Sequence, residues 1–222
     1  MNFERLEAYA LAAFMLYNIL RETSNSLPAN DLIGTTQTIG IPFPLRKHSP
    51  SKELATTLKI FSGGQTGVDR AALDVAIELG IPHGGWCPKG RVSEDGVIPF
   101  QYQLREMTTD LYADRTRQNI IDSEGTLILY HERLQGGTLL TSRYAEQQNK
   151  PCHKVRLPRT VQSWESKTLM TKVKAVRKWL HDNEIHTLNV AGPRGSKEPE
   201  IYLRAKEFLK LLLTEPPRLP LD

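Results

Sequence analysis

The chain contains little cysteine. Only Cys87 and Cys152 occur among its 222 residues, and neither belongs to a C-x-x-C pair. The six histidines show no H-x-x-x-H spacing. These absences argue against a disulfide framework and a structural zinc site, so no metal site is predicted. They fit a reducing, cytoplasmic location. Cys87 stays open as either a sulfur ligand to a metal centre or a small buried hydrophobic residue.

The sequence also lacks a long hydrophobic run and a block of like charge. Residues 8–20 (AYALAAFMLYNIL) are too few to span a bilayer, and Glu4 and Glu7 precede them where a signal peptide carries basic residues. We therefore expect no membrane association, and we interpret residues 1–22 as an amphipathic helix that docks on the main body or forms an oligomer contact. The net charge of +4 permits anionic ligands but does not predict nucleic-acid binding.

Prolines divide the chain into three parts. Residues 23–57 hold several prolines with glycine, serine and threonine between them, which is typical of a linker. A double proline at 216–217 ends the last helical pattern. We therefore expect an N-terminal helix and extended linker over residues 1–57, a ligand-binding domain over 58–214, and a proline-rich tail over 215–222.

Within the central part, short apolar runs alternate with helical periodicity. Strands are predicted at 58–62, 126–130, 152–157 and 187–191. Helices are predicted at 67–79, 112–122, 138–149, 164–182 and 197–213. Residues 83–110 show no clear periodicity and are expected to form a long functional loop. This alternation predicts an α/β fold: a Rossmann-like, doubly wound parallel sheet with an N-terminal helical arm.

Three glycine-containing loops, at 62–67, 131–138 and 192–196, each follow a predicted strand and precede a helix. Parallel sheets bind ligands at the carboxyl ends of their strands, and a helix N-terminus attracts anions. The first loop is neither a G-x-G-x-x-G nor a Walker A loop, so it indicates neither a dinucleotide nor ATP hydrolysis. The predicted phosphate-binding residues are Gly63, Gly64, Gln65, Thr66, Gly67, Gly136, Gly137 and Thr138, with the backbone N–H groups of Gly64–Gly67, Gly137 and Thr138 as donors.

Some of the first loop has a simpler explanation. Thr66 and Asp69 fit the [ST]-x-x-[DE] pattern of a capped helix, which leaves Gly63, Gly64 and Gln65 unexplained. Asp69 would either cap its helix or accept a hydrogen bond from a ribose or pterin group.

Charged and aromatic residues near these loops complete the predicted site. The cationic side chains of Lys89, Arg91 and Arg115 could pair with a phosphate. Trp86 could stack on a planar ring or belong to the core. Asn119 shares a helix face with Arg115, and this face points at the phosphate or at solvent. The candidates outside the glycine loops are Asp69, Arg70, Trp86, Lys89, Arg91, Arg115 and Asn119.

Several unusual stretches recur in a fixed order between residues 58 and 213: IFSGGQTGVDRAALDVAIELGIPHGGWCPKGR, EDGVIP, YADRTRQNIIDSEGTLIL, GGTLLT and NVAGPRGSK. They resemble the molybdenum cofactor carrier family, the circularly permuted YpsA-like branch of the SLOG superfamily, which is related to LOG or lysine-decarboxylase-like proteins. The resemblance implies a Rossmann-like homo-oligomer, a dimer or tetramer. It also implies a nucleotide-like or phosphorylated pterin ligand at the glycine loops, with the molybdenum cofactor (molybdopterin) as bound cargo in a carrier.

The same resemblance bears on catalysis. LOG-type relatives cleave the N-glycosidic bond of nucleoside monophosphates, and their motif resembles G-G-x-G-T-x-x-E. Here Thr141 stands three residues past Thr138, where the acid is expected. Asp69, Glu94 or Asp95 could substitute, although Glu94 and Asp95 could equally form a solvated turn. We therefore expect a binding protein rather than an enzyme. The alternatives are a nucleotide phosphoribohydrolase and a nucleotide-signal sensor that acts through residues 1–57.

Overall fold

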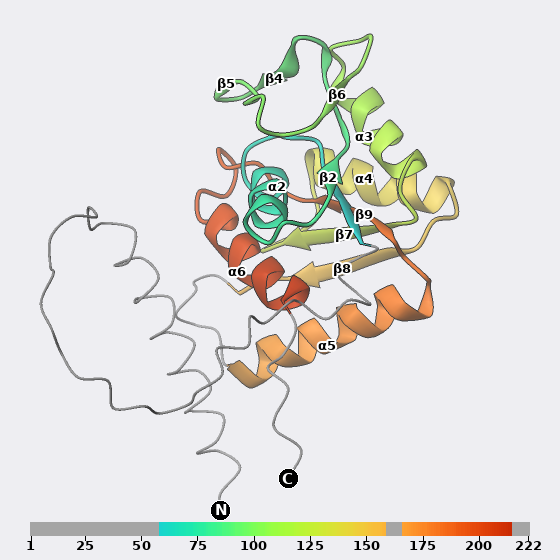
Figure 1. The fold of residues 1–222 in the computed structure, drawn as a ribbon, viewed down its shortest axis with the longest axis vertical. Helices are drawn as coiled ribbons and strands as arrows, with labels where there is room; N and C mark the ends of the chain where they lie inside the picture. The colour runs from blue at the N-terminus through green and yellow to red at the C-terminus, as the bar shows by residue number, and fades with distance from the viewer. Residues whose placement is uncertain (1–57, 159–165, 215–222) are drawn as a thin grey trace, which may run out of the picture. The chain divides into compact units, whose positions relative to one another are not determined.

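The computed structural model describes residues 58–158 and 166–214, and these residues form an α/β fold around one parallel sheet (Figure 1). The sheet contains five strands in the order β2-β1-β9-β7-β8, and every neighbouring pair is parallel. The strands are β1 (Lys59–Phe61), β2 (His83–Gly84), β7 (Gly125–Tyr130), β8 (Cys152–Arg156) and β9 (Thr187–Ala191). The predicted Rossmann-like class is confirmed, and the four predicted strands agree with β1, β7, β8 and β9 to within one or two residues.

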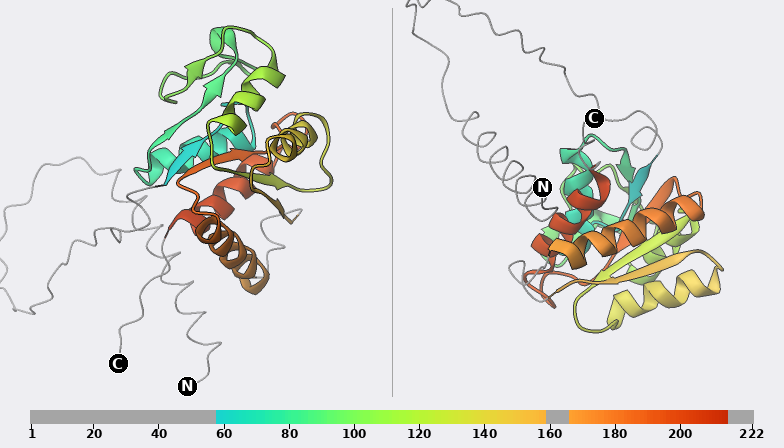
Figure 2. Two further views of the ribbon diagram at one scale, coloured as in Figure 1. Left: turned by 90° about the vertical axis from the view of Figure 1, so that its right-hand side faces the viewer. Right: turned by 90° about the horizontal axis from the view of Figure 1, so that it is seen from below.

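Helices cover both faces of this sheet. The helices α2 (Val68–Glu78), α5 (Ser166–Asp182) and α6 (Ile201–Leu213) share one apolar core with the strands. The helices α3 (Tyr112–Ile121) and α4 (Gly136–Gln147) pack against each other, and α4 lies across the sheet from α5 (Figure 2). Two-sided coverage explains why the central strand β7 is buried along almost its whole length, since a parallel sheet buries both faces.

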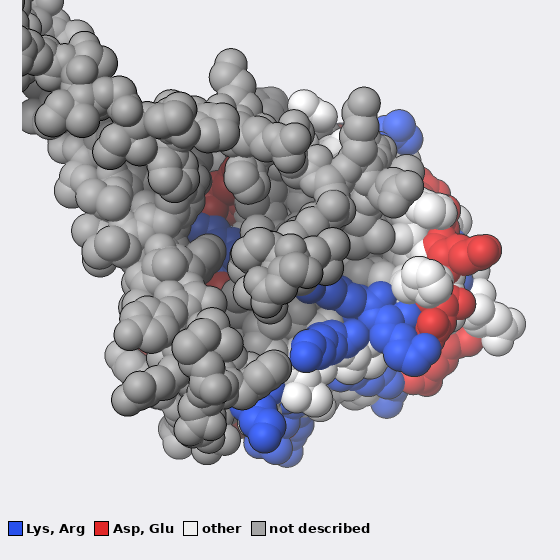
Figure 3. Space-filling view, turned by 60° about the horizontal axis from the view of Figure 1, so that its bottom comes forward, with Lys and Arg blue, Asp and Glu red and all other residues white. Residues whose placement is uncertain are grey.

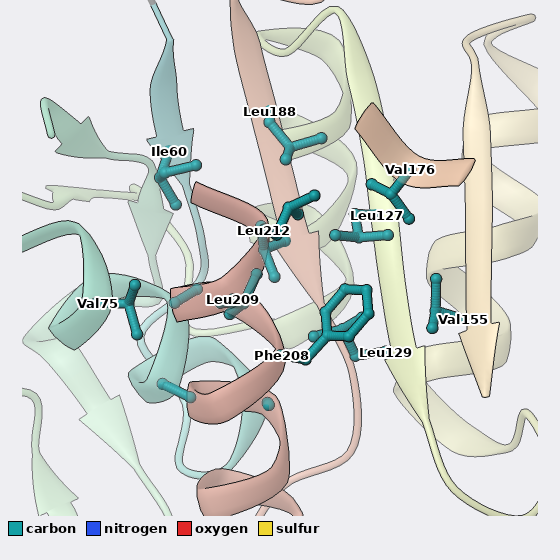
Figure 4. Close-up of a cluster of buried hydrophobic side chains, with 14 of the residues drawn as sticks. Ile60, Val75, Leu127, Leu129, Val155, Val176, Leu188, Phe208, Leu209 and Leu212 are labelled. Atoms are coloured by element: carbon teal, nitrogen blue, oxygen red, sulfur yellow. The ribbon is translucent and has the colours of Figure 1, made fainter. Parts of the chain in front are cut away.

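The main core lies between α6 and the central strands. Phe208, Leu209 and Leu212 of α6 face Leu127 and Leu129 of β7 (Figure 4). The side chains of a strand alternate between its two faces, so Leu127 and Leu129 share this face. This packing fixes β7 relative to α6.

Residues 83–110, predicted to form a long loop, contain several short strands as well as loops. His83 pairs with Ile60, which makes β2 an edge strand of the main sheet. Beyond it, β3 (Trp86–Cys87) pairs with β6 (Arg105–Glu106), a short 3-10 turn η1 spans Lys89–Arg91, and β4 (Val92–Ser93) pairs with β5 (Gly96–Val97). Strands of two residues are too short to produce a visible alternation.

These short strands enclose a second apolar core that contains Cys87, Ile98, Tyr102 and Leu104 together with Leu73 of α2. Cys87 is fully buried, and burial raises the pKa of its thiol. Its position agrees with the interpretation of Cys87 as a buried hydrophobic residue.

Helix boundaries differ from the predictions mainly at N-termini. The helix α4 begins at Gly136, two residues before the predicted start, and α6 begins at Ile201 after a turn over residues 197–200. The predicted N-terminal helix, linker and proline-rich tail lie outside the described residues.

On the side that carries α5, Lys and Arg side chains gather at the surface (Figure 3), and the exposed lysines of α5 include Lys167, Lys174 and Lys178. Within the described ranges, no helix is both long and apolar enough to cross a membrane.

Candidate functional site

A cavity of about 590 Å³ lies at the carboxyl end of the sheet. Its walls come from four segments, at 65–69, 112–116, 133–141 and 191–198. The neighbouring strands β9 and β7 lead into helices on opposite faces of the sheet, α6 and α4. Ligands of doubly wound folds bind at such a switch point. The cavity therefore lies where the topology predicts a ligand site.

Six of the predicted site residues line this cavity: Gln65, Asp69, Arg115, Gly136, Gly137 and Thr138. The last three form the first turn of α4. Its N-cap residue, Gln135, makes no capping hydrogen bond through its side chain. A Cβ atom at Gly136 or Gly137 would meet no atom within 4 Å, so the backbone here is open to a ligand. An uncapped helix N-terminus with open glycines is suited to an anion.

Asp69 and Arg115 form a buried ion pair in the cavity wall. Nη1 of Arg115 lies 3.0 Å from Oδ2 of Asp69, and the same oxygen accepts from the N–H of Gln65 over 3.3 Å. Asp69 is 3% exposed, and burial raises the pKa of its carboxyl although Arg115 and the backbone N–H oppose this. A Cβ at Gly63 would lie 1.5 Å from Nη1 of Arg115. Gly63 therefore leaves the space in which Arg115 reaches Asp69.

The first glycine loop is held by the protein itself, which corrects two predictions. The N–H of Gln65 donates to Asp69 and the N–H of Thr66 donates to the Gln65 side chain, so neither N–H is available as a phosphate donor. The N-cap residue of α2 is Gly67, with φ 78°, and no side chain caps the helix. The Thr66 hydroxyl instead donates to Glu94 and accepts from the N–H of Gly195. Thr66 thus joins three loops rather than starting a helix.

Glu94 and Asp95 lie outside the cavity wall. Glu94 accepts from the N–H and hydroxyl of Ser196, over 2.9 and 2.5 Å. Burial opposes its charge, but the hydrogen bonds from Ser196 and Thr66 hold the pKa of Glu94 below its ordinary value. Asp95 accepts from Ser93 and pairs with Arg70, and both lower its pKa. Both carboxylates therefore fasten loops together.

Arg70, Arg91 and Asn119 also have partners within the protein and do not line the cavity. Arg70 donates to the carbonyl of Gly64 over 2.8 Å. Arg91 is 5% exposed, and its guanidinium donates to four carbonyls, those of Ile98, Pro99, Tyr102 and Leu104. The Asn119 amide bonds both the N–H and the carbonyl of Trp86. These contacts stabilise the region of short strands between α2 and α3.

Trp86 and Lys89 lie outside the cavity as well. The indole N–H of Trp86 donates to Asp122 over 2.7 Å, and the Arg105 guanidinium lies over its ring. Lys89 is exposed, and its backbone N–H donates to Thr109. Of the remaining predicted residues, Gly64 has φ +74° and packs against Leu104, which explains this glycine by backbone conformation and close contact.

The lining residues that were not predicted include Tyr112, Arg133, Arg194, Lys197 and Glu198. Arg133 and Arg194 lie inside the glycine loops HERLQGGT and GPRGS, so their position beside these glycines was the available signal. Tyr112 is an aromatic residue in the cavity lining, a position that was predicted for Trp86. Among the residues that the structure describes, no three His, Cys, Asp or Glu side chains are grouped as a metal site would need.

Fold and cavity together define a Rossmann-like domain with a cavity at the switch point of its sheet. The chain belongs to the circularly permutated YpsA SLOG family, whose model matches residues 60–213. It is 45% identical to a protein from Syntrophus aciditrophicus whose crystal structure is described as that of a "Putative molybdenum carrier protein". That similarity covers 71% of this chain and 96% of the other, with a TM-score of 0.65. No curated protein matches this chain.

Proposed function

We propose that this protein binds a phosphate-bearing ligand of the nucleotide or pterin kind, and that it acts as a molybdenum cofactor carrier. The observation that supports this most directly is the charge of the cavity. Four cationic side chains, Arg115, Arg133, Arg194 and Lys197, line it with only two carboxyl groups, Asp69 and Glu198. The lining thus holds two more cationic side chains than carboxyl groups, while Arg194 is also paired at 3.7 Å with Glu94 outside the wall. The first turn of α4 lines the same cavity, and a phosphate monoester carries up to two negative charges.

The shape and chemistry of the cavity also fit a pterin phosphate. Its volume of about 590 Å³ suits a single small molecule. Tyr112 and Leu140 offer surfaces for a flat ring, whereas Arg133 and the first turn of α4 offer donors for the phosphate. The name of the Syntrophus aciditrophicus protein supports molybdenum cofactor as the cargo. The protein would hold the pterin and phosphate parts of the cofactor, and the molybdenum would remain on the cargo.

Binding without turnover is favoured over hydrolysis. Asp69 is engaged by Arg115, while Glu94 and Asp95 are engaged by other loops outside the cavity wall. Thr141 stands where the LOG-like acid would be, and its hydroxyl donates to the carbonyl of Gly137 over 2.9 Å. None of the three predicted substitute carboxylates is therefore free to act on a glycosidic bond. A homo-oligomer, either a dimer or a tetramer, is part of the proposal.

Native mass spectrometry of the freshly purified full chain tests this function. We expect an oligomer that carries a bound pterin or molybdenum species, identified after denaturation. A protein that is empty, and that also fails to bind added pyrophosphate and phosphorylated pterin, would refute the proposed site.

A matched pair of variants shows whether binding occurs in this cavity. Arg133→Ala removes a lining guanidinium and should weaken ligand binding about 10- to 100-fold, as expected for a charge-assisted hydrogen bond. Arg143→Ala changes an exposed arginine of α4 that does not line the cavity, and it should bind as the wild type does. Equal affinities for the two variants would place the ligand elsewhere.

A further inference from the structure

Glu198 lies in the turn between β9 and α6, and its backbone is fixed on both sides. Its N–H donates to the carbonyl of Arg194 over 3.2 Å, and its carbonyl accepts from the N–H of Ile201 over 3.0 Å. The residue lines the cavity beside Lys197. A hydrogen-bonded turn limits the directions that its side chain can take. Glu198 therefore belongs to a preformed wall of the cavity.

Three buried polar atoms near this turn have no hydrogen-bond partner among the described residues. They are Oε2 of Glu198 and both Nε and Nη1 of Arg204. Arg204 is 6% exposed, and its remaining nitrogen, Nη2, pairs with Glu200 at 2.8 Å. Buried polar groups in native proteins are nearly always hydrogen-bonded, so such a cluster calls for an explanation. Oε2 of Glu198 has almost no accessible surface, so the carboxyl group would gain a ligand as its partner by turning from this position toward the cavity that the residue lines.

The charges around Glu198 leave its acceptor capacity unused. Burial raises the pKa of its carboxyl, His131 and Arg204 oppose this, and Glu132 adds to it. Neither residue forms an ion pair with Glu198 in the described part of the chain. The carboxyl is thus influenced by positive charge but not neutralised by direct contact, a suitable state for a group that binds donors on a ligand.

We propose that Glu198 recognises a ligand edge that carries two adjacent N–H donors, as in the 2-amino-4-oxopyrimidine ring shared by guanine and pterins. An ionised carboxylate only accepts hydrogen bonds, and its two oxygens match two parallel N–H groups. Adenine offers a ring nitrogen lone pair beside a single amino group, which would face the carboxylate unfavourably. This inference rests on the proposed function, because the phosphate of the same ligand must be held by Arg133 and the first turn of α4.

Calorimetric titration of the full chain with GMP, IMP and AMP tests this recognition, since the three share ribose and phosphate. GMP has both N–H donors, IMP lacks the 2-amino group, and AMP lacks the paired edge. We expect GMP to bind about 10- to 100-fold more tightly than AMP, with IMP between them. A second pair, 6-hydroxymethylpterin phosphate and its 2-oxo counterpart, makes the same comparison on a pterin ring. The member with the 2-amino group should bind more tightly.

Two variants separate recognition from stability. Glu198→Gln should remove the preference for the 2-amino ligands and leave pyrophosphate binding unchanged. Glu200→Gln alters the ion-pair partner of Arg204 but not the cavity wall, so it should keep the preference. Pyrophosphate binding with no preference among the rings, or with a preference that survives Glu198→Gln, would overturn this inference alone. A protein that binds no probe, pyrophosphate included, would refute the anion site and the inference with it.

Discussion

Alanine at Gly63 should break the ion pair in the cavity wall. The new Cβ would lie 1.5 Å from Nη1 and 2.2 Å from Cζ of Arg115, and 2.8 Å from Oδ2 of Asp69. The guanidinium is the mobile end of a long side chain, so it should move rather than the backbone. Asp69, which is almost fully buried, would then lose its cationic partner.

The size of this effect follows from the burial of the pair. Breaking a buried ion pair by removing one partner costs about 3–5 kcal/mol of unfolding free energy. Arg115 can swing into the cavity and be solvated there, so we expect a loss near the lower end, about 3 kcal/mol. Gly137→Ala is the control, because its Cβ would meet nothing within 4 Å. This control should be neutral or gain up to about 1 kcal/mol from improved helix propensity.

Urea unfolding at pH 7, followed by circular dichroism, measures both variants. The difference between Gly63→Ala and the wild type should shrink as the pH falls, because protonation removes the unpaired charge of Asp69. The pKa of this carboxyl is already raised by burial and should rise further without Arg115. Wild-type stability in Gly63→Ala, or an equal loss in Gly137→Ala, would show that the contact between Gly63 and Arg115 is wrong.

Three further predictions concern other parts of the fold. Glu94→Gln should lower the free energy of unfolding by about 1–2 kcal/mol at pH 7. Because the folded-state pKa of Glu94 is lowered, its contribution to stability is lost as the pH falls through that value. Thermal melts of variant and wild type should therefore converge in acid. Phe208→Ala should lose about 3–5 kcal/mol in urea unfolding because the ring is fully buried, whereas Leu203→Ala, at a residue 59% exposed, should change stability by no more than about 0.5 kcal/mol. Arg91→Met should destabilise the protein by at least about 2 kcal/mol, because it leaves four carbonyls without their donor. Calorimetry should nevertheless show an unchanged affinity for pyrophosphate. A loss of affinity in a folded variant would mean that Arg91 binds the ligand after all.

Much of the fold could be predicted because its helices and long strands carry strong periodic signals. The helix α2 places Val68, Ala71, Ala72 and Val75 on one buried face, as its spacing predicts. The region between α2 and α3 could not be predicted in this way. Its strands are two residues long, and they are stabilised by contacts such as Arg91 with the carbonyls of residues 98–104. Such contacts leave no repeating pattern in the sequence.

The first glycine loop shows how a local motif can mislead. Thr66 and Asp69 have the spacing of a capping box, but their partners lie far along the chain. Thr66 bonds Glu94, which is 28 residues away, and Asp69 pairs with Arg115, which is 46 residues away. Both side chains gain more from these tertiary partners than a local cap would offer, because a buried Asp69 needs a cation to offset its desolvation. A motif of four residues contains no information about distant partners that compete with the local cap for the same side chains.

Residue type alone could not separate ligand-binding arginines from structural ones either. Arg91 and Arg115 have the same guanidinium and the same predicted role, yet four carbonyls surround Arg91 while Arg115 shares the cavity wall with Asp69. The difference depends on where each side chain meets the sheet. Arg115 belongs to α3 and lines the cavity at the carboxyl end of the strands, together with residues of the glycine loops. The topology places Arg133 and Glu198 in the cavity wall, because the chain leaves β7 and β9 toward opposite faces at that same edge.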